Sequence, residues 1–162
     1  MTSFYIIPGY GEKKKDYSWL ISEASKKYDV KFLDLQLKNN SLQELSRTKI
    51  EPNSIVFGFS VGALIAYKLK TPVTKGIYCS MSDILGSDAK KEFKHLVDFF
   101  GEKTAKELQR MKYSKPKVRK SFFFYGDKEM SEDLNKIGKI QVVKNTGHKF
   151  NKNYRKAVLE VI

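Results

Sequence analysis

A serine stands between two glycines where a short apolar run gives way to a segment suited to a helix. The stretch is Gly58-Phe59-Ser60-Val61-Gly62, preceded by Ser54-Ile55-Val56-Phe57. A serine hydroxyl raised on a tight strand-to-helix turn can attack a carbonyl carbon, and the close backbone contacts of such a turn favour glycine two residues before and after it. The pattern therefore predicts a nucleophile at Ser60. The alternative is an ordinary turn in which Ser60 caps the helix.

A serine nucleophile needs a base, and the chain contains two histidines. His148 lies in the loop Asn145-Thr146-Gly147-His148, after the last expected strand and before the last expected helix. His95 lies within an expected helix, off the apolar stripe that ends at Phe100, and we interpret it as a solvated surface residue. His148 is therefore the predicted base.

Three carboxylates are candidates for orienting this base. Asp127 and Glu129 directly follow the apolar run that ends at Tyr125, and Asp83 lies in a polar loop after an earlier run. A carboxylate that accepts the ring N–H of His148 would fix the tautomer and the orientation of the imidazole. Most acids in such positions are exposed loop charges or helix caps. The residues alone therefore leave the choice among the three open.

Two backbone N–H groups are the expected donors to the negative oxygen of a tetrahedral intermediate. The residue after the nucleophile, Val61, supplies one of them. The glycine loop Gly9-Tyr10-Gly11, which follows the first apolar run, supplies the other, and we assign it to Tyr10. The alternative for this loop is an ordinary turn.

Apolar runs and helical stripes alternate along the whole chain. Six runs predict strands, at 4–7, 30–37, 54–57, 76–80, 121–125 and 140–143. Helices are expected at 17–28, 41–45, 61–69, 93–100, 105–111, 134–137 and 154–161. Most of the strand runs are continuously apolar. This pattern predicts an α/β fold, a single-domain, doubly wound, three-layer sandwich with a mostly parallel sheet and helices on both faces.

The expected topology brings the candidate residues together. The carboxyl ends of parallel strands meet at one edge of a sheet, where ligands of such folds bind. Ser60, His148, the glycine loop and all three acids follow strand ends, so we expect them to converge there. The run at 30–37 alternates between apolar and polar residues in its second half, which places it at the border of the sheet.

Length, charge and cysteine content narrow the class of protein. The 162 residues carry 31 Lys and Arg against 18 Asp and Glu, a net charge of +13. These lysines are dispersed and lack interleaved aromatic motifs, so nucleic-acid binding is not expected. The single cysteine, Cys79, argues against a disulfide framework, and no apolar stretch reaches the ~20 residues of a membrane span. With no segment typical of a signal peptide, we expect a cytoplasmic protein.

In its order of glycine loop, Ser60, acid and His148, the chain resembles the α/β-hydrolase superfamily, and especially its small serine hydrolases without a cap domain. The resemblance covers nearly the whole length and implies one domain, residues 1–162. In that family a late strand commonly ends in a glycine with the acid three residues later. This spacing implies Glu129, after Gly126, as the acid.

The same resemblance ranks the other acids and marks one departure. Asp127 is the second choice, as the neighbour of the implied acid, and Asp83 is the third, at a position that some members use. The family's early His-Gly pair is Pro8-Gly9 here, so a side chain that often braces the loop is missing. Residues 88–113 are the only candidate for a partial cover.

The resemblance implies a serine hydrolase that cleaves carboxylic esters or thioesters through an acyl-enzyme on Ser60, with no metal or organic cofactor. Two alternatives stay open: an inactive hydrolase-like protein that binds through its basic surface, and an acyltransferase. Six lysines are expected near the catalytic loops and make an anionic small-molecule substrate or an acidic carrier a candidate, namely Lys13, Lys14, Lys15, Lys128, Lys144 and Lys149.

Overall fold

The computed structural model describes residues 1–34, 47–82, 87–112, 115–129 and 137–162. Six parallel strands form one sheet in the order β2-β1-β3-β4-β5-β6. Their bounds are β1 Ser3–Ile7, β2 Asp29–Phe32, β3 Ile55–Phe59, β4 Val73–Cys79, β5 Val118–Gly126 and β6 Ile140–Val143. The predicted number of strands and the border position of the second strand are confirmed.

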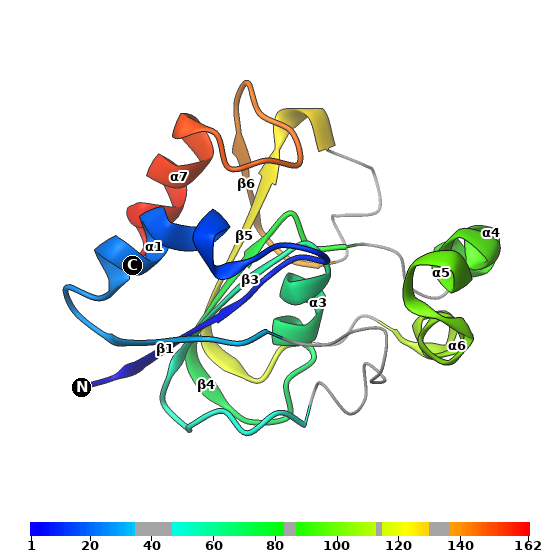
Figure 1. Ribbon diagram of the computed structural model, residues 1–162, viewed down its shortest axis with the longest axis horizontal. Coiled ribbons are helices and arrows are strands. Elements are labelled where there is room, and N and C mark those ends of the chain that lie inside the picture. Colours follow the sequence, from blue (N-terminus) through cyan, green and yellow to red (C-terminus); the bar gives the residue numbers. More distant parts are fainter. Residues whose placement is uncertain (35–46, 83–86, 113–114, 130–136) are drawn as a thin grey trace.

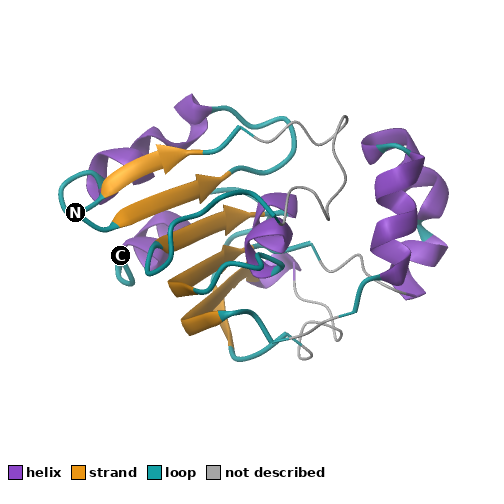
Figure 2. Ribbon diagram, turned by 90° about the horizontal axis from the view of Figure 1, so that it is seen from below, coloured by secondary structure: helices purple, strands orange, loops and turns teal. Residues whose placement is uncertain are grey.

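Helices cover both faces of this sheet (Figure 1). On one face lie the 3-10 turn η1 (Lys14–Tyr17), α1 (Ser18–Ala24) and α7 (Lys152–Leu159). On the other lie α3 (Val61–Tyr67) and, beyond it, a group of three helices: α4 (Ser87–Lys91), α5 (Phe93–Phe100) and α6 (Glu102–Arg110). Figure 2 shows this group set apart from the strands, with α3 in between. The predicted three-layer α/β architecture is confirmed.

The alternation of side chains along the strands builds two separate cores. Phe4, Ile6 and Phe57 point to the face covered by α1 and α7, and Tyr5 and Ile7 point to the face covered by α3. All five are less than 5% exposed. Burial of both faces explains why these runs are continuously apolar in the sequence.

The helices beyond α3 are anchored by a narrow apolar stripe. Leu96 of α5 and Leu108 of α6 belong to the same buried cluster as Val61 and Leu64 of α3. Gly101 adopts φ 84° between α5 and α6 and breaks the helix there, as its position after Phe100 predicts.

Several boundaries differ from the sequence-based expectations. β5 begins at Val118 and β4 at Val73, whereas the apolar runs predicted starts at 121 and 76. Val73 pairs with Val118, and Lys75 pairs with Lys120, because backbone ladder bonds extend a strand whether or not its side chains are apolar. The helix expected at 17–28 is a 3-10 turn followed by the shorter α1. The helices expected at 41–45 and over Leu134, and the third-choice acid Asp83, lie outside the described residues.

Among the described residues, no helix combines the length and the apolar character that crossing a membrane requires.

Candidate functional site

Ser60 occupies the sharp turn from β3 into α3. Its backbone angles are φ 53° and ψ −123°, a conformation that side-chain-bearing residues rarely adopt. A Cβ atom on Gly58 would lie 2.5 Å from Ala63 Cα, and one on Gly62 would lie 2.2 Å from the Pro8 carbonyl oxygen. The strained turn therefore requires both glycines, for the steric reason that the five-residue pattern suggested.

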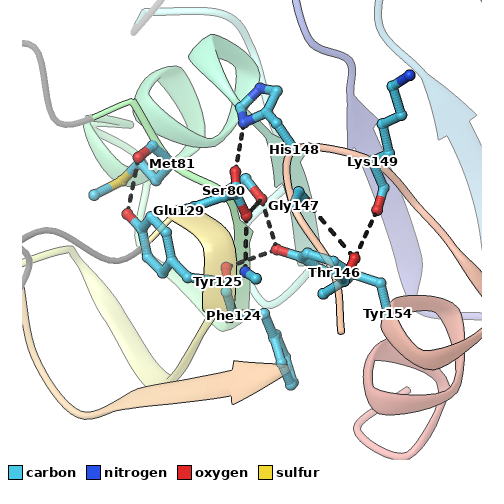
Figure 3. Close-up of polar contacts among 11 residues, drawn as sticks. Ser80, Met81, Phe124, Tyr125, Glu129, Thr146, Gly147, His148, Lys149 and Tyr154 are labelled. Atoms are coloured by element: carbon cyan, nitrogen blue, oxygen red, sulfur yellow. Dashed lines mark hydrogen bonds and ion pairs between the residues drawn. The ribbon is translucent and has the colours of Figure 1, made fainter. Parts of the chain in front are cut away.

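His148 and Glu129 form a hydrogen-bonded pair across two loops. His148 Nδ1 lies 2.6 Å from Glu129 Oε1, so the ring N–H donates to the carboxylate (Figure 3). The His148 side chain is 55% exposed and that of Glu129 only 12%. Glu129 ends the 3-10 turn η2 (Asp127–Glu129) that follows β5.

The second carboxylate oxygen of Glu129 is bound from the opposite side. Glu129 Oε2 accepts hydrogen bonds from the Gly126 N–H at 2.7 Å and from the Ser80 hydroxyl at 2.8 Å. Burial raises the pKa of Glu129, but the hydrogen bonds from His148, Gly126 and Ser80 outweigh it and hold the pKa below its ordinary value. The carboxylate facing His148 is therefore kept ionised.

Asp127, two residues earlier, is engaged elsewhere. Its carboxylate accepts the backbone N–H groups of Asn145 at 2.8 Å and Thr146 at 3.0 Å, and these two bonds lower the pKa of Asp127. It thereby fixes the loop that carries His148 without contacting the imidazole. The expected first-choice acid is the one that meets His148, and the second choice positions the loop backbone.

Ser60 and His148 border the same cavity of about 330 Å³. No hydrogen bond joins these two described side chains directly. The remaining lining comes from the glycine loop, the end of β3, the start of α3 and helix α5: Gly9, Tyr10, Glu12, Phe59, Val61, Ser82, His95, Leu96, Phe99 and Phe100.

Comparison with solved structures identifies the fold. One similar structure is an α/β hydrolase enzyme from the metagenome of sediments of the lagoon of Mar Chica, Morocco, with a TM-score of 0.64 and 18% sequence identity. The match covers 99% of this chain and 88% of that enzyme. Carboxylesterase CesB from Bacillus subtilis is also similar, with a TM-score of 0.65 and 11% identity over 99% of this chain and 81% of that protein. MenH from S. aureus has a TM-score of 0.61 and 12% identity over 98% of this chain and 92% of its own. The chain has the α/β-hydrolase fold. Its sequence matches no protein-family model and no curated protein.

The glycine loop of this α/β-hydrolase fold is held by two residues that the sequence analysis missed. Glu12 Oε2 accepts the Gly9 N–H at 2.8 Å, and the same N–H lies 3.1 Å from the hydroxyl oxygen of Tyr17. The Tyr17 hydroxyl in turn donates to Glu12. With the Gly9 N–H engaged, the neighbouring Tyr10 N–H is consistent with the expected second donor. Val61 begins α3 and stays the first expected donor, since the opening N–H groups of a helix lack an intrahelical acceptor.

Two further residues that the sequence analysis missed, Ser80 and Tyr154, extend the hydrogen bonds of Glu129. Ser80 has φ 43° and is 2% exposed at the end of β4. Its hydroxyl lies 2.9 Å from that of Tyr154, which donates to the Phe124 carbonyl at 2.7 Å. Position after a strand was the only signal for Ser80, and nothing in the local sequence of α7 marks Tyr154.

His95 matches the expectation of an exposed helix residue and has a further position at the cavity. It is exposed on α5, as expected, but it also borders the cavity beside Phe99, with ring centroids 4.9 Å apart. Residues of α5 line the same cavity as Ser60, and helical periodicity alone cannot show that. None of the six lysines expected near the catalytic loops lines the cavity. Within the described ranges, no group of His, Cys, Asp and Glu side chains is arranged to hold a metal ion.

Proposed function

We propose that this protein is a serine hydrolase that cleaves carboxylic esters or thioesters through an acyl-enzyme on Ser60. The observation that carries the proposal is the 2.6 Å contact between Glu129 and His148 beside a cavity that also contains Ser60 on a strained turn. A nucleophile, a base and an ionised orienting group are the parts that acyl transfer requires.

In the proposed reaction the His148 Nε2 accepts the Ser60 proton as the hydroxyl oxygen attacks the acyl carbon. The Glu129 carboxylate stabilises the imidazolium through Nδ1. Protonated His148 then gives its proton to the departing alcohol or thiol, and the acyl group stays on Ser60. Finally His148 takes a proton from water, whose oxygen attacks the acyl carbon. The bond from this carbon to Ser60 Oγ breaks, Oγ takes the proton from His148, and the acid is released.

The Val61 and Tyr10 N–H groups are the proposed donors to the oxyanion formed in both halves of the reaction. Each such donor typically contributes about 100- to 1000-fold in rate. Glu12 and Tyr17 would position this loop, because they bind the N–H that immediately precedes Tyr10. They replace the bracing that the family's histidine gives in the early His-Gly pair.

The similar structures support the reaction class only through the shared fold. One is named an α/β hydrolase enzyme and another a carboxylesterase, so a small ester is a reasonable substrate for this chain. We further propose that residues 1–162 act as one domain, with the helices of region 88–113 as its partial cover. A reducing, cytoplasmic setting is consistent with the single, fully buried Cys79.

The test is labelling with a fluorophosphonate probe followed by intact mass measurement. We expect one adduct on the wild-type protein, none on Ser60→Ala, and much slower labelling of His148→Ala. Ser82→Ala removes the other serine hydroxyl of the cavity and is expected to keep the adduct. An adduct that survives Ser60→Ala, or none on folded wild-type protein, would reject the mechanism.

The two alternatives give different results in the same experiment. A binding protein with an inactive site would show no adduct, whereas an acyltransferase would be labelled like a hydrolase. Transfer is separated from hydrolysis by supplying an ester with and without a competing alcohol. Ser60-dependent formation of the new ester in preference to the free acid would favour transfer, because both reactions share the acyl-enzyme.

A further inference from the structure

Aromatic side chains surround the space next to Ser60. The Tyr10 ring meets Phe99 at 5.8 Å and Phe100 at 5.5 Å between centroids, in edge-on arrangements. On the other side of the cavity, Phe59 lies 4.9 Å from the His148 ring. The walls therefore offer ring faces and edges to whatever occupies the cavity next to the nucleophile.

Two of these rings are more exposed than such residues usually are. Tyr10 is 38% exposed and Phe99 is 44% exposed, and both border the cavity. Tyr10 belongs to the glycine loop and Phe99 to α5, so the pair joins the catalytic loop to the helical cover. An apolar ligand that buries these rings gains the free energy of removing their surface from water.

The charge of the lining argues against an ionic ligand. Among the described residues, no Lys or Arg borders this cavity, although the chain has a net charge of +13. Glu12 is the only described carboxylate in the lining, and its Oε2 is already bound by Gly9 and Tyr17. A free carboxylate on a ligand would find no lysine or arginine among the described lining residues, and an ammonium group would find a carboxylate whose charge is already partly satisfied.

We propose that the substrate carries a neutral aromatic ring close to its ester carbonyl, and that Tyr10, Phe99 and Phe100 bind this ring. The inference rests on the proposed function of the same cavity. Ring-on-ring contacts are worth more than the burial of an equally large saturated ring, by about two- to tenfold in an equilibrium or specificity constant. The ring can belong to the acyl part or to the alcohol part of the ester.

The experiment compares kcat/KM over esters that differ in one feature. The reference ester is methyl 3-phenylpropanoate. Methyl 3-cyclohexylpropanoate tests whether the ring must be aromatic. Monomethyl succinate tests a negative charge in place of the ring, and the methyl ester of 4-(trimethylammonio)butanoate tests a positive charge. The phenyl ester is expected to be about fivefold better than the cyclohexyl ester. Equal rates for the two rings, or a preference for either charged ester, would overturn the proposal. A parallel measurement with 2-phenylethyl acetate shows which side of the ester the ring occupies.

Two substitutions on one helix give the matched test. Phe99→Leu removes a cavity ring, and Phe93→Leu removes a ring of α5 that packs against the core instead. We expect Phe99→Leu to abolish the preference for phenyl over cyclohexyl in kcat/KM. Phe93→Leu should keep the preference. The same ratio in both variants would contradict a role for the cavity ring.

A binding measurement separates this proposal from the proposed reaction. The Ser60→Ala variant is titrated with 1-phenylpentan-3-one, the ketone in which a CH2 group replaces the ester oxygen of methyl 3-phenylpropanoate. The ring signals of His95 and Phe99 are followed by NMR. Binding of this ketone without any hydrolysis by the wild type would reject the reaction and keep the ring site. Ser60-dependent hydrolysis of methyl acetate without ketone binding would reject the ring site and keep the reaction.

Discussion

Glu129 and Asp127 stand two residues apart and have different environments. Glu129 receives a side-chain hydrogen bond from His148 on one oxygen and two further bonds on the other. Asp127 receives only backbone N–H groups from the loop before His148. One carboxylate is thus placed to act on the imidazole and the other to hold the backbone that presents it.

This division predicts unequal effects of amide substitution. Glu129→Gln keeps the shape but removes the charge opposite the imidazolium, so kcat/KM should fall by about 100- to 10,000-fold. Asp127→Asn should lower kcat/KM far less and should destabilise the loop, because an amide has one acceptor oxygen for two N–H groups. Steady-state turnover of a methyl ester measures both. A larger loss for Asp127→Asn would make Asp127 the acid.

The lowered pKa of Glu129 links stability to pH. Its pKa in the folded protein lies below the ordinary value of 4.5. Between the unfolded-state and the folded-state pKa, the unfolded chain therefore binds more protons than the folded protein. The free energy of unfolding falls as the pH drops through this range. Each tenfold change in proton affinity corresponds to about 1.4 kcal/mol. We expect Glu129→Gln to lose stability less steeply than wild type between about pH 5 and pH 3. Urea unfolding across this range tests it, with the exposed Glu160→Gln as the control; equal slopes for Glu129→Gln and wild type would contradict it.

Ser80 is expected to act through Glu129 and not on the substrate. Removing its hydroxyl in Ser80→Ala deletes one donor to the carboxylate, which should raise the pKa of Glu129 and lower kcat by about fivefold with little change in KM. The acidic limb of the pH profile of kcat should move to higher pH. Ser22→Ala, on the exposed side of α1, is the control. A rise in KM with an unmoved pH profile would point to a purely structural role.

At the scale of elements, the turn after β3 depends on how closely α3 approaches β1. Gly62 sits where a Cβ atom would strike the carbonyl oxygens of Pro8 and Ile7, at 2.2 and 2.4 Å. Both obstacles are backbone atoms, which cannot rotate away as a side chain would. The contact joins the two elements that carry the proposed oxyanion donors.

Gly62→Ala should therefore separate α3 from β1. We expect it to lower the free energy of unfolding by about 1–3 kcal/mol, the usual range for forcing extra atoms into packed structure. Gly147→Ala is the matched control, since its nearest neighbour would be Lys128 Cβ at 3.8 Å, an ordinary contact. Urea denaturation of both variants gives the comparison, and equal stabilities would show that the close approach relaxes without cost.

At the scale of the whole molecule, charge and reaction site are separated. The net charge is +13, yet the described part of the cavity lining contains no Lys or Arg. The expectation of an anionic substrate relied on lysines near the strand ends, and those side chains do not border the cavity. Long-range attraction is the only remaining way for them to act on a substrate.

Salt tests whether that attraction matters. For a neutral ester, KM should stay constant between about 0.05 and about 0.5 M sodium chloride, since screening acts only on charged partners. The same titration with monomethyl succinate measures any contribution from the basic surface. A KM for the neutral ester that rises steeply with salt would show that the positive field takes part in substrate binding.

The sequence by itself determined the architecture and two members of the site. Continuously apolar runs predicted a buried parallel sheet, and Gly58 and Gly62 around Ser60 predicted the turn, because a steric requirement for glycine is local and appears directly in the residues. The position of His148 after the last strand followed from the same topology. The residues themselves left the acid open, and Glu129 was implied only by the spacing in a similar family.

Only the tertiary structure decided which side chains meet. Glu129 and not Asp127 contacts His148, Glu12 and Tyr17 hold the loop at Gly9, and Ser80 links Glu129 to Tyr154. The contacts of Glu129 and Ser80 join residues from separate strands and loops, so they depend on register and loop closure. Gly9, Glu12 and Tyr17 are close in the sequence, and their contacts depend on how the chain folds back after Gly9. The same holds for His95 and Phe99, which reach the cavity because α5 packs over α3. Local periodicity specifies which face of a helix is buried, but the partner it is buried against is set by the assembled fold.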